Sequence, residues 1–206
     1  MNEESPSYVE FITGEGGVID TWLRRGAAGF RLDVADELPD DFIEKIRAAV
    51  KRVSPEKFLL GEVWEDATTK FGFDHRRTYL LGKGLDSVMN YPFKNSVLDF
   101  VKGKPAQQAA NEILSICEHY PAPAINTALN FLSTHDTERA LTVIADEPAN
   151  GRGREWQSGR SVTGEAYEEG MLRLRMAYAI IYTLPGVPCL YYGDEIGMQG
   201  YRDPFN

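Results

Sequence analysis

The chain has 206 residues, long enough for one domain with a sizeable core, and with 43% hydrophobic and 26% charged residues it has the composition of a soluble globular protein. Its formal net charge of −9 disfavours a nucleic-acid partner, because a polyanion would be repelled. No stretch approaches the roughly 18 to 20 consecutive apolar residues that cross a membrane. We therefore expect neither nucleic acid nor membrane as a partner.

The two cysteines, Cys117 and Cys189, give no disulfide framework. Cys189 lies in an apolar stretch and is predicted to be a buried thiol. The sequence contains neither a zinc-ligand spacing nor a phosphate-binding glycine loop, so we predict no metal ligands and no nucleotide.

Apolar runs of strand type alternate with stretches of helical period, which predicts a parallel sheet and an α/β fold. The clearest helix is amphipathic, with Phe42, Ile43, Ile46, Ala49, Val50 and Val53 on one face. Another helix places Ile113, Leu114 and Cys117 on one side. The predicted helices are 18–23, 39–53, 106–119 and 165–184, and Gly26 is predicted to end the first of them. The predicted strands are 29–34, 58–63, 85–89, 128–132 and 187–191.

The segment 146–163 is rich in glycine and arginine and has no hydrophobic period. It follows the strand at 128–132, which predicts a long loop on the same edge of the sheet. Loops of this length are often functional or mobile, and a disordered insertion is equally compatible with the composition.

Three carboxylates each follow a predicted strand: Asp33, Glu62 and Asp136. The carboxyl ends of parallel strands meet at one edge, which is where α/β proteins build their chemistry. Acids delivered to one edge by separate strands are what cleavage of a glycosidic bond requires. The joint pattern carries this inference, because each acid alone has a structural explanation.

Arg31 and Asp33 are two residues apart on one strand and face the same side. The guanidinium would keep the carboxylate ionised and oriented, as a nucleophile must be, although an ion pair at a strand end is the structural alternative. Glu62 lies in an apolar run before Trp64, which disfavours a charge and suits a general acid, although Glu62 could also cap the next helix. The pair His135 and Asp136 could hydrogen-bond sugar hydroxyls or serve structure alone.

The segments GFRLDVADE, LLGEVWEDA, FLSTHDTERAL and GVPCLYYGDEIGM, in this order, resemble the α-amylase superfamily of glycoside hydrolases, the glycoside hydrolase family 13 type. The nearest motifs are those of the neopullulanase, cyclomaltodextrinase and maltogenic amylase group. The resemblance implies a (β/α)8 barrel that acts on α-linked glucans. The motif of the family's eighth strand is matched by Gly186, Pro188, Tyr192, Gly193 and Glu195.

Carried over by motif, Asp33 resembles the catalytic nucleophile, Glu62 the general acid/base and Asp136 the third acid. Arg31 resembles the arginine that supports the nucleophile, and His135 resembles a residue that binds hydroxyl groups.

Substrate contacts are also predicted for Trp64 and Arg139. Rim aromatics that could stack on glucose rings are Trp64, Tyr91, Trp156 and Tyr201, whereas Trp22 is predicted to belong to the core.

The family's Asn-His region near the third strand has no counterpart here, while the segment at Met1, Asn2 and Glu3 resembles the tail of a motif before strand four. The resemblance thus implies that residues 1–206 are the C-terminal part of the catalytic domain, roughly strands four to eight, with the first three strands absent and both ends truncated. The missing N-terminal half of the barrel would then be a required partner, and a homo-oligomer stays open.

The resulting hypothesis is a retaining α-glycosidase, active in the intact parent and inactive as this segment alone. A truncated sugar-binding fragment and a transglycosylase are the alternatives. No cofactor is required. Structural calcium is common in the family, but this segment does not support a site for it.

Overall fold

The structure is a computed structural model that describes residues 3–206, so that Met1 and Asn2 of the predicted tail motif lie outside the described residues. The chain divides into two compact units, which we describe separately. Unit 1 comprises residues 3–89 and 116–128, and unit 2 comprises residues 90–115 and 129–206. The helix α5 (Ala106–His119) contributes residues to both units.

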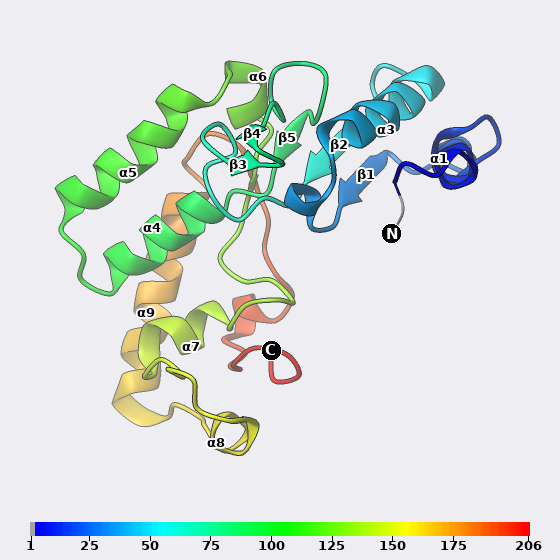
Figure 1. Ribbon diagram of the computed structural model, residues 1–206. Coiled ribbons are helices and arrows are strands. Elements are labelled where there is room, and N and C mark those ends of the chain that lie inside the picture. Colours follow the sequence, from blue (N-terminus) through cyan, green and yellow to red (C-terminus); the bar gives the residue numbers. More distant parts are fainter. Residues whose placement is uncertain (1–2) are drawn as a thin grey trace. The chain divides into compact units, whose positions relative to one another are not determined.

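Unit 1 is built on a three-stranded parallel sheet with the order β1 (Gly29–Leu32), β2 (Phe58–Gly61) and β5 (Ser87–Val88) (Figure 1). A parallel pair requires a crossover, and α3 (Asp40–Val53) connects β1 to β2. Two helices at the N-terminal side, α1 (Pro6–Thr13) and α2 (Val18–Arg24), pack on α3, and α6 (Ala122–Ile125) packs near β5.

The helix α3 confirms the amphipathic pattern of the sequence. It buries Phe42, Ile43, Ile46, Ala49 and Val50 and carries acidic residues in its first turn and basic residues in its last turn. This charge distribution complements the helix dipole.

After Glu62 the chain forms an antiparallel hairpin that the sequence did not predict, made of β3 (Phe71–Gly72) and β4 (His75–Arg76). Its two turn residues, Phe73 and Asp74, both have positive φ angles, as tight hairpin turns of this kind require. The hairpin is fastened to the start of α3, because Nε2 of His75 lies 2.9 Å from Oδ2 of Asp40.

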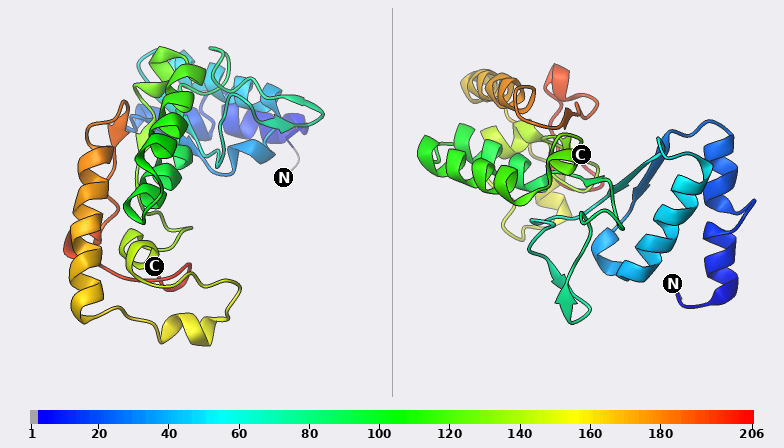
Figure 2. Two further views of the ribbon diagram at one scale, coloured as in Figure 1. Left: turned by 90° about the vertical axis from the view of Figure 1, so that its left-hand side faces the viewer. Right: turned by 90° about the horizontal axis from the view of Figure 1, so that it is seen from above.

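Unit 2 is a helical packing of α4 (Tyr91–Val101), α7 (Ala140–Ala145) and α9 (Gly164–Ile181), the long orange helix in Figure 2. Two short parallel strands, β6 (Leu129–Asn130) and β7 (Val187–Pro188), pair beside them. Short helical turns occur at α8 (Arg154–Ser158) and η2 (Asp194–Ile196), and η1 (Ala35–Glu37) follows β1 in unit 1. The fully buried core residues of unit 2 include Leu132, Ala140, Leu141, Ala177 and Ile181.

The α/β alternation is confirmed, but several elements differ from the prediction. The strands are shorter, and the segment 146–163 contains α8 rather than a plain loop. The helix α4 was missed although Asn90 caps it by accepting the N–H of Phe93 and a proline opens it, two signals that are readable in the sequence. Leu114 and Trp22 are 55% and 52% exposed, so their predicted burial was wrong.

Both cysteines are free and partly buried, and burial raises the pKa of each thiol. Among residues 3–206, no helix combines the length and the apolar character that a membrane crossing requires.

We expect Leu141→Ala to lower the free energy of unfolding by about 2 to 5 kcal/mol, because the side chain is fully buried between α7 and α9 and its loss leaves a cavity. The matched control is Leu172→Ala on α9, where the side chain is 62% exposed and the change should stay within about 0.5 kcal/mol. Urea unfolding of both variants measures the difference. Equal effects would contradict the placement of this core.

We expect the imidazole of His75 to titrate above its usual value of 6.5, because hydrogen bonds to Asp40 and to the Phe73 carbonyl raise its pKa. A raised folded pKa means that the contact stabilises the fold fully below pH 6.5 and that this contribution is lost as pH rises through the folded value. An NMR titration of the His75 ring measures this. Asp40→Asn should return the midpoint towards 6.5, and Asp41→Asn, which removes a neighbour paired with Lys45, should leave it unchanged.

Candidate active site

Arg31 connects the two acids that the sequence placed at neighbouring strand ends. Its Nη1 donates a short hydrogen bond to Oδ1 of Asp33, and its Nη2 lies 2.9 Å from Oε1 of Glu62. Since one guanidinium contacts both carboxylates, the carboxylates lie side by side at the carboxyl ends of β1 and β2. The prediction that Arg31 turns towards Asp33 is confirmed.

The two acids differ sharply in exposure. The side chain of Asp33 is 72% exposed, whereas that of Glu62 is only 3% exposed. The surroundings of Glu62 are also more polar than the sequence predicted, because its carboxylate contacts a guanidinium and a backbone N–H. Asp33 can therefore reach an external ligand, while Glu62 is held within the unit.

Backbone contacts fix Glu62 against the turn that follows Asp33. The N–H of Val34 donates to Oε2 of Glu62 at 3.0 Å, and the N–H of Ala35 donates to the Glu62 carbonyl at 3.1 Å. The N–H of Glu62 donates in turn to the carbonyl of Leu32 at 2.9 Å. Main chain and side chain of Glu62 are thus both tied to one segment.

Val34 has a left-handed backbone, with φ 45° and ψ 50°. A β-branched residue in this region is strained by about 1 to 3 kcal/mol, and such strain persists only where the surroundings over-determine it. Here the hydrogen bonds to Glu62 supply that constraint. No local sequence signal pointed to this role of Val34, because valine is not a residue expected at a positive φ.

Trp64 follows Glu62 by two residues and is 39% exposed, so it remains available for contact with a ligand. The other predicted rim aromatics lie differently. Tyr91 and Tyr201 are 1% and 3% exposed, with Tyr91 packed edge-on against Phe131, and their predicted place on an accessible rim was wrong. Trp156 is half-buried between the guanidinium groups of two arginines.

In unit 2, Nε2 of His135 lies 3.1 Å from Oδ2 of Asp136, and the two side chains are 64% and 39% exposed. Two hydrogen bonds hold the backbone of their loop. Asp136 donates its N–H to Oγ1 of Thr134, and Asn206 donates its side-chain amide to the carbonyl of His135 at 2.6 Å. Both side chains are therefore presented at the surface of this unit by a fixed backbone. Whether they share one edge with Asp33 and Glu62 stays a prediction.

Arg139 lies differently from the substrate contact that the sequence predicted. Its side chain is fully buried, its guanidinium packs on the rings of Tyr191 and Tyr192, and its Nη1 lies 3.3 Å from Oδ1 of Asp194. Asp194 also accepts hydrogen bonds from Ser133 and Tyr178. Arg139 thus anchors the loop that carries His135 and is closed to a ligand in the described part of the chain.

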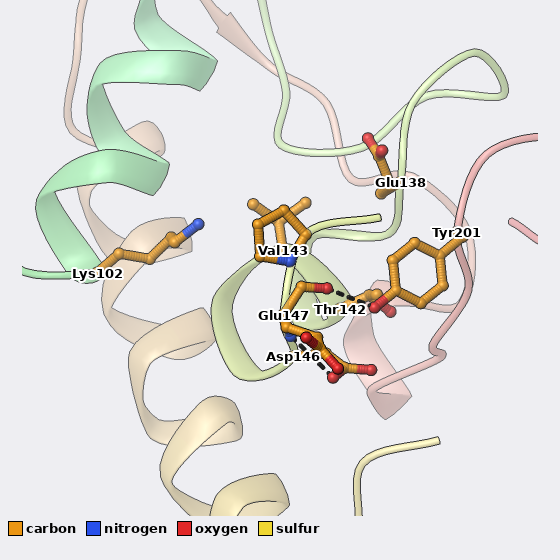
Figure 3. A pocket seen from close by; sticks show the side chains of 8 residues that line it. Lys102, Glu138, Thr142, Val143, Asp146, Glu147 and Tyr201 are labelled. Carbon is orange, nitrogen blue, oxygen red and sulfur yellow. Dashed lines mark hydrogen bonds between the residues drawn. The ribbon is translucent and has the colours of Figure 1, made fainter. Parts of the chain in front are cut away.

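A small cavity of about 120 Å³ lies in unit 2 next to α7 (Figure 3). Its three acidic residues are already engaged, because Asp146 pairs with Arg160, Glu147 with Arg152 and Glu138 with Arg202. Burial raises the pKa of the Asp146 carboxyl, but the hydrogen bonds from Arg160, from the Glu147 backbone and from Tyr201, together with the charge of Arg160, outweigh burial and hold that pKa below its usual value. The hydroxyl of Tyr201 donates to the Glu147 carbonyl at 2.6 Å. The cavity therefore lies between α7 with the residues that follow it, the end of α4 and Tyr201, and we assign no ligand to it.

Among residues 3–206, no group of three or more histidine, cysteine, aspartate or glutamate side chains is placed to hold a metal ion.

Comparison with known proteins agrees with the motifs. The family described as alpha amylase, catalytic domain, matches residues 1–205. An amylopullulanase from Thermoanaerobacter thermohydrosulfuricus is 34% identical over 97% of this chain and 14% of its own length, and a cyclomaltodextrinase from a Bacillus species is 32% identical over 99% of this chain and 31% of its own.

Among solved structures, the cyclic α-maltosyl-(1→6)-maltose hydrolase from Arthrobacter globiformis superposes with a TM-score of 0.78 at 28% identity, covering 99% of this chain and 39% of that one. The chain thus spans well under half of the relatives that it matches. Since the family match extends over almost every residue, the chain belongs to the alpha-amylase family of glycoside hydrolases, glycoside hydrolase family 13.

Proposed function

We propose that this chain supplies the catalytic carboxylates of a retaining hydrolase of α-linked glucans. The observation that carries the proposal is the shared guanidinium of Arg31, which brings Asp33 and Glu62 together at adjacent strand ends. Retaining glycosidases require two carboxyl groups about 5 to 5.5 Å apart, and we expect this separation in the working enzyme. The names of the relatives support the substrate class, since they are an amylopullulanase, a cyclomaltodextrinase and a hydrolase of cyclic α-maltosyl-(1→6)-maltose.

In this proposal the oxygen of Asp33 attacks the anomeric carbon while Glu62 protonates the departing glycosidic oxygen. For this step the Glu62 side chain must turn away from the nearly buried position that it has in this structure. A covalent glycosyl-enzyme forms and the leaving sugar departs with the proton. Glu62 then takes a proton from water, which attacks the anomeric carbon, releases Asp33 and completes hydrolysis. Attack by a sugar hydroxyl in place of water gives transglycosylation, which shares the first half-reaction.

The buried Arg139 has no part in this proposal, and the other predicted site residues orient or bind groups rather than form bonds, Asp136 as the third catalytic acid. Arg31 holds Asp33 in a fixed orientation, because a planar guanidinium binds a carboxylate directionally. Asp136 and His135 bind sugar hydroxyls, and Trp64 offers a ring on which a glucose unit can stack. No organic or redox cofactor takes part in this sequence of steps.

We also propose that residues 1–206 form the C-terminal part of a (β/α)8 catalytic domain, roughly strands four to eight. Supporting this, the family motifs follow strands in the family's order, and the chain covers 31% of the cyclomaltodextrinase. In the described sheet of unit 1, β1 pairs with β2 alone and leaves its other edge free. An open edge invites association, so we expect this segment alone to be inactive and to need the rest of the barrel.

The decisive experiment follows the anomeric form of the first product. With the full-length protein that carries this chain and a maltooligosaccharide, cyclodextrin or pullulan as substrate, early proton NMR spectra should show the α-anomer, because two displacements retain configuration. Asp33→Asn should abolish turnover, and Glu37→Gln, which changes an exposed acid four residues away, should not. An initial β-anomer would exclude the retaining mechanism.

We expect Arg31→Lys to lower kcat by about 100-fold, because an ammonium cannot hold Asp33 and Glu62 at once with the geometry of a planar fork. Steady-state kinetics on the same substrates measures the loss. Arg25→Lys, at an exposed arginine after α2, is the control and should keep normal turnover. Near-normal kcat in Arg31→Lys would remove the supporting role assigned to this residue.

A further inference from the structure

Arg77, which follows the hairpin strand β4, has a fully buried side chain that the proposed reaction does not use. Its guanidinium is packed between two rings, 5.1 Å from the centre of Phe73 and 4.5 Å from that of Tyr79. A charged group in this position is costly unless its donors are satisfied. The acceptors of its hydrogen bonds therefore indicate which part of the chain the buried guanidinium holds in place.

Within the described residues, the acceptors of the Arg77 guanidinium lie on one short segment, residues 36–40. Nε donates to Oδ1 of Asp40 at 2.8 Å, Nη1 donates to the carbonyl of Asp36 at 2.9 Å, and Nη2 donates a short hydrogen bond to the carbonyl of Leu38. Two of these three contacts are to backbone oxygens. Such contacts fix the path of the main chain rather than the rotamer of a side chain.

This segment is the direct continuation of the turn that carries the candidate nucleophile. Asp33 precedes it, and the N–H groups of Val34 and Ala35 hold Glu62. The strained backbone of Val34 is thus constrained on one side by Glu62 and on the other by the residues that Arg77 binds. Without the second constraint, relaxation of Val34 would move both the turn and the N–H that Glu62 accepts.

A second contact ties the same two segments. Nζ of Lys70, which precedes the hairpin, lies 3.1 Å from Oδ2 of Asp36. The chain that leaves β2 after Glu62 therefore folds back and binds the chain that leaves β1 after Asp33. Neither the hairpin nor Arg77 touches the two catalytic carboxylates directly in the contacts described above, so the effect on them would pass through residues 34–40.

We propose that Arg77 is a positioning residue of the active site, which holds residues 36–40 so that Asp33 and Glu62 keep their mutual orientation. The inference rests on the proposed function of these two acids. A purely structural arginine would support the stability of unit 1 as a whole, whereas a positioning arginine controls this turn selectively. The two roles make different predictions for the backbone amides of the turn.

The test compares Arg77→Gln and Arg77→Lys in the full-length protein with Arg76→Gln. Arg76 is the matched control, because it is the exposed neighbour whose Nε donates to the Thr68 carbonyl and which has no contact with residues 36–40 in the hydrogen bonds described. The readouts are amide hydrogen exchange, kcat and KM on a maltooligosaccharide, and the melting temperature. The reference amide is that of Phe58, which donates to Ala28 at the far end of the β1–β2 pair.

In Arg77→Gln we expect exchange at Val34 and Ala35 to rise at least about tenfold while the Phe58 amide stays protected. We expect kcat to fall by about 100-fold with little change in KM, since a displacement of about 1 Å at the reacting groups has an effect of this size. Arg77→Lys should recover part of both losses because it retains the charge beside Asp40. Arg76→Gln should match the unsubstituted protein in exchange and kcat.

The inference is overturned if the amides of Val34, Ala35 and Phe58 accelerate in parallel, or if kcat and the turn amides stay at normal values. If Arg77→Gln melts below the assay temperature, the amide exchange and kcat of Arg77→Lys are compared with those of Arg76→Gln instead. If the unsubstituted protein cleaves no α-glucan, the proposed function fails. The exchange data then still decide whether Arg77 holds the turn.

Discussion

The structure of unit 1 depends on a single guanidinium shared between two carboxylates. The parallel register sets Arg31 beside Leu60, so the residues that leave β1 and β2 emerge next to each other. Two acids brought together in this way would repel each other if no cation lay between them. Arg31 supplies that cation and, because its fork is planar, also sets the direction in which each carboxylate points. The register of β1 and β2 therefore also determines which side chains meet in the proposed site.

The second requirement is to keep a nearly buried acid in place. Glu62 is 2% exposed and would be strongly disfavoured there without partners. The partners of the Glu62 carboxylate are the guanidinium of Arg31 and the N–H of Val34. The Val34 N–H reaches Glu62 from a residue with a left-handed backbone. The strained backbone of Val34 thus accompanies the hydrogen bond that holds Glu62. The same turn follows the exposed Asp33 directly. This coupling explains why the residues after the turn need anchors of their own.

The sequence predicted those features that depend on local pattern. The amphipathic face of α3 and the order of strands and helices follow from hydrophobic period, and Asp33 and Glu62 could be placed because each ends an apolar run. It failed where burial depends on distant partners. Arg139 was predicted to face a ligand, but its partner Asp194 lies 55 residues further along the chain and nothing local announces it. Tyr91 was misplaced for the same reason, since its burial against Phe131 is a tertiary event.

Each unit has a buried arginine that stacks on aromatic rings and binds the chain near a candidate acid of the proposed site. Arg77 lies between Phe73 and Tyr79 and binds Asp40 and two carbonyls, and Arg139 lies against Tyr191 and Tyr192 and binds Asp194 and one carbonyl. A lysine could satisfy neither arrangement, because it offers no planar face to stack on rings and no fork that reaches a carboxylate and a carbonyl together. A buried arginine that stacks on rings can therefore be as specific in its requirement as an exposed acid, and the effect of a substitution at either arginine should be measured first in the backbone of the adjoining turn.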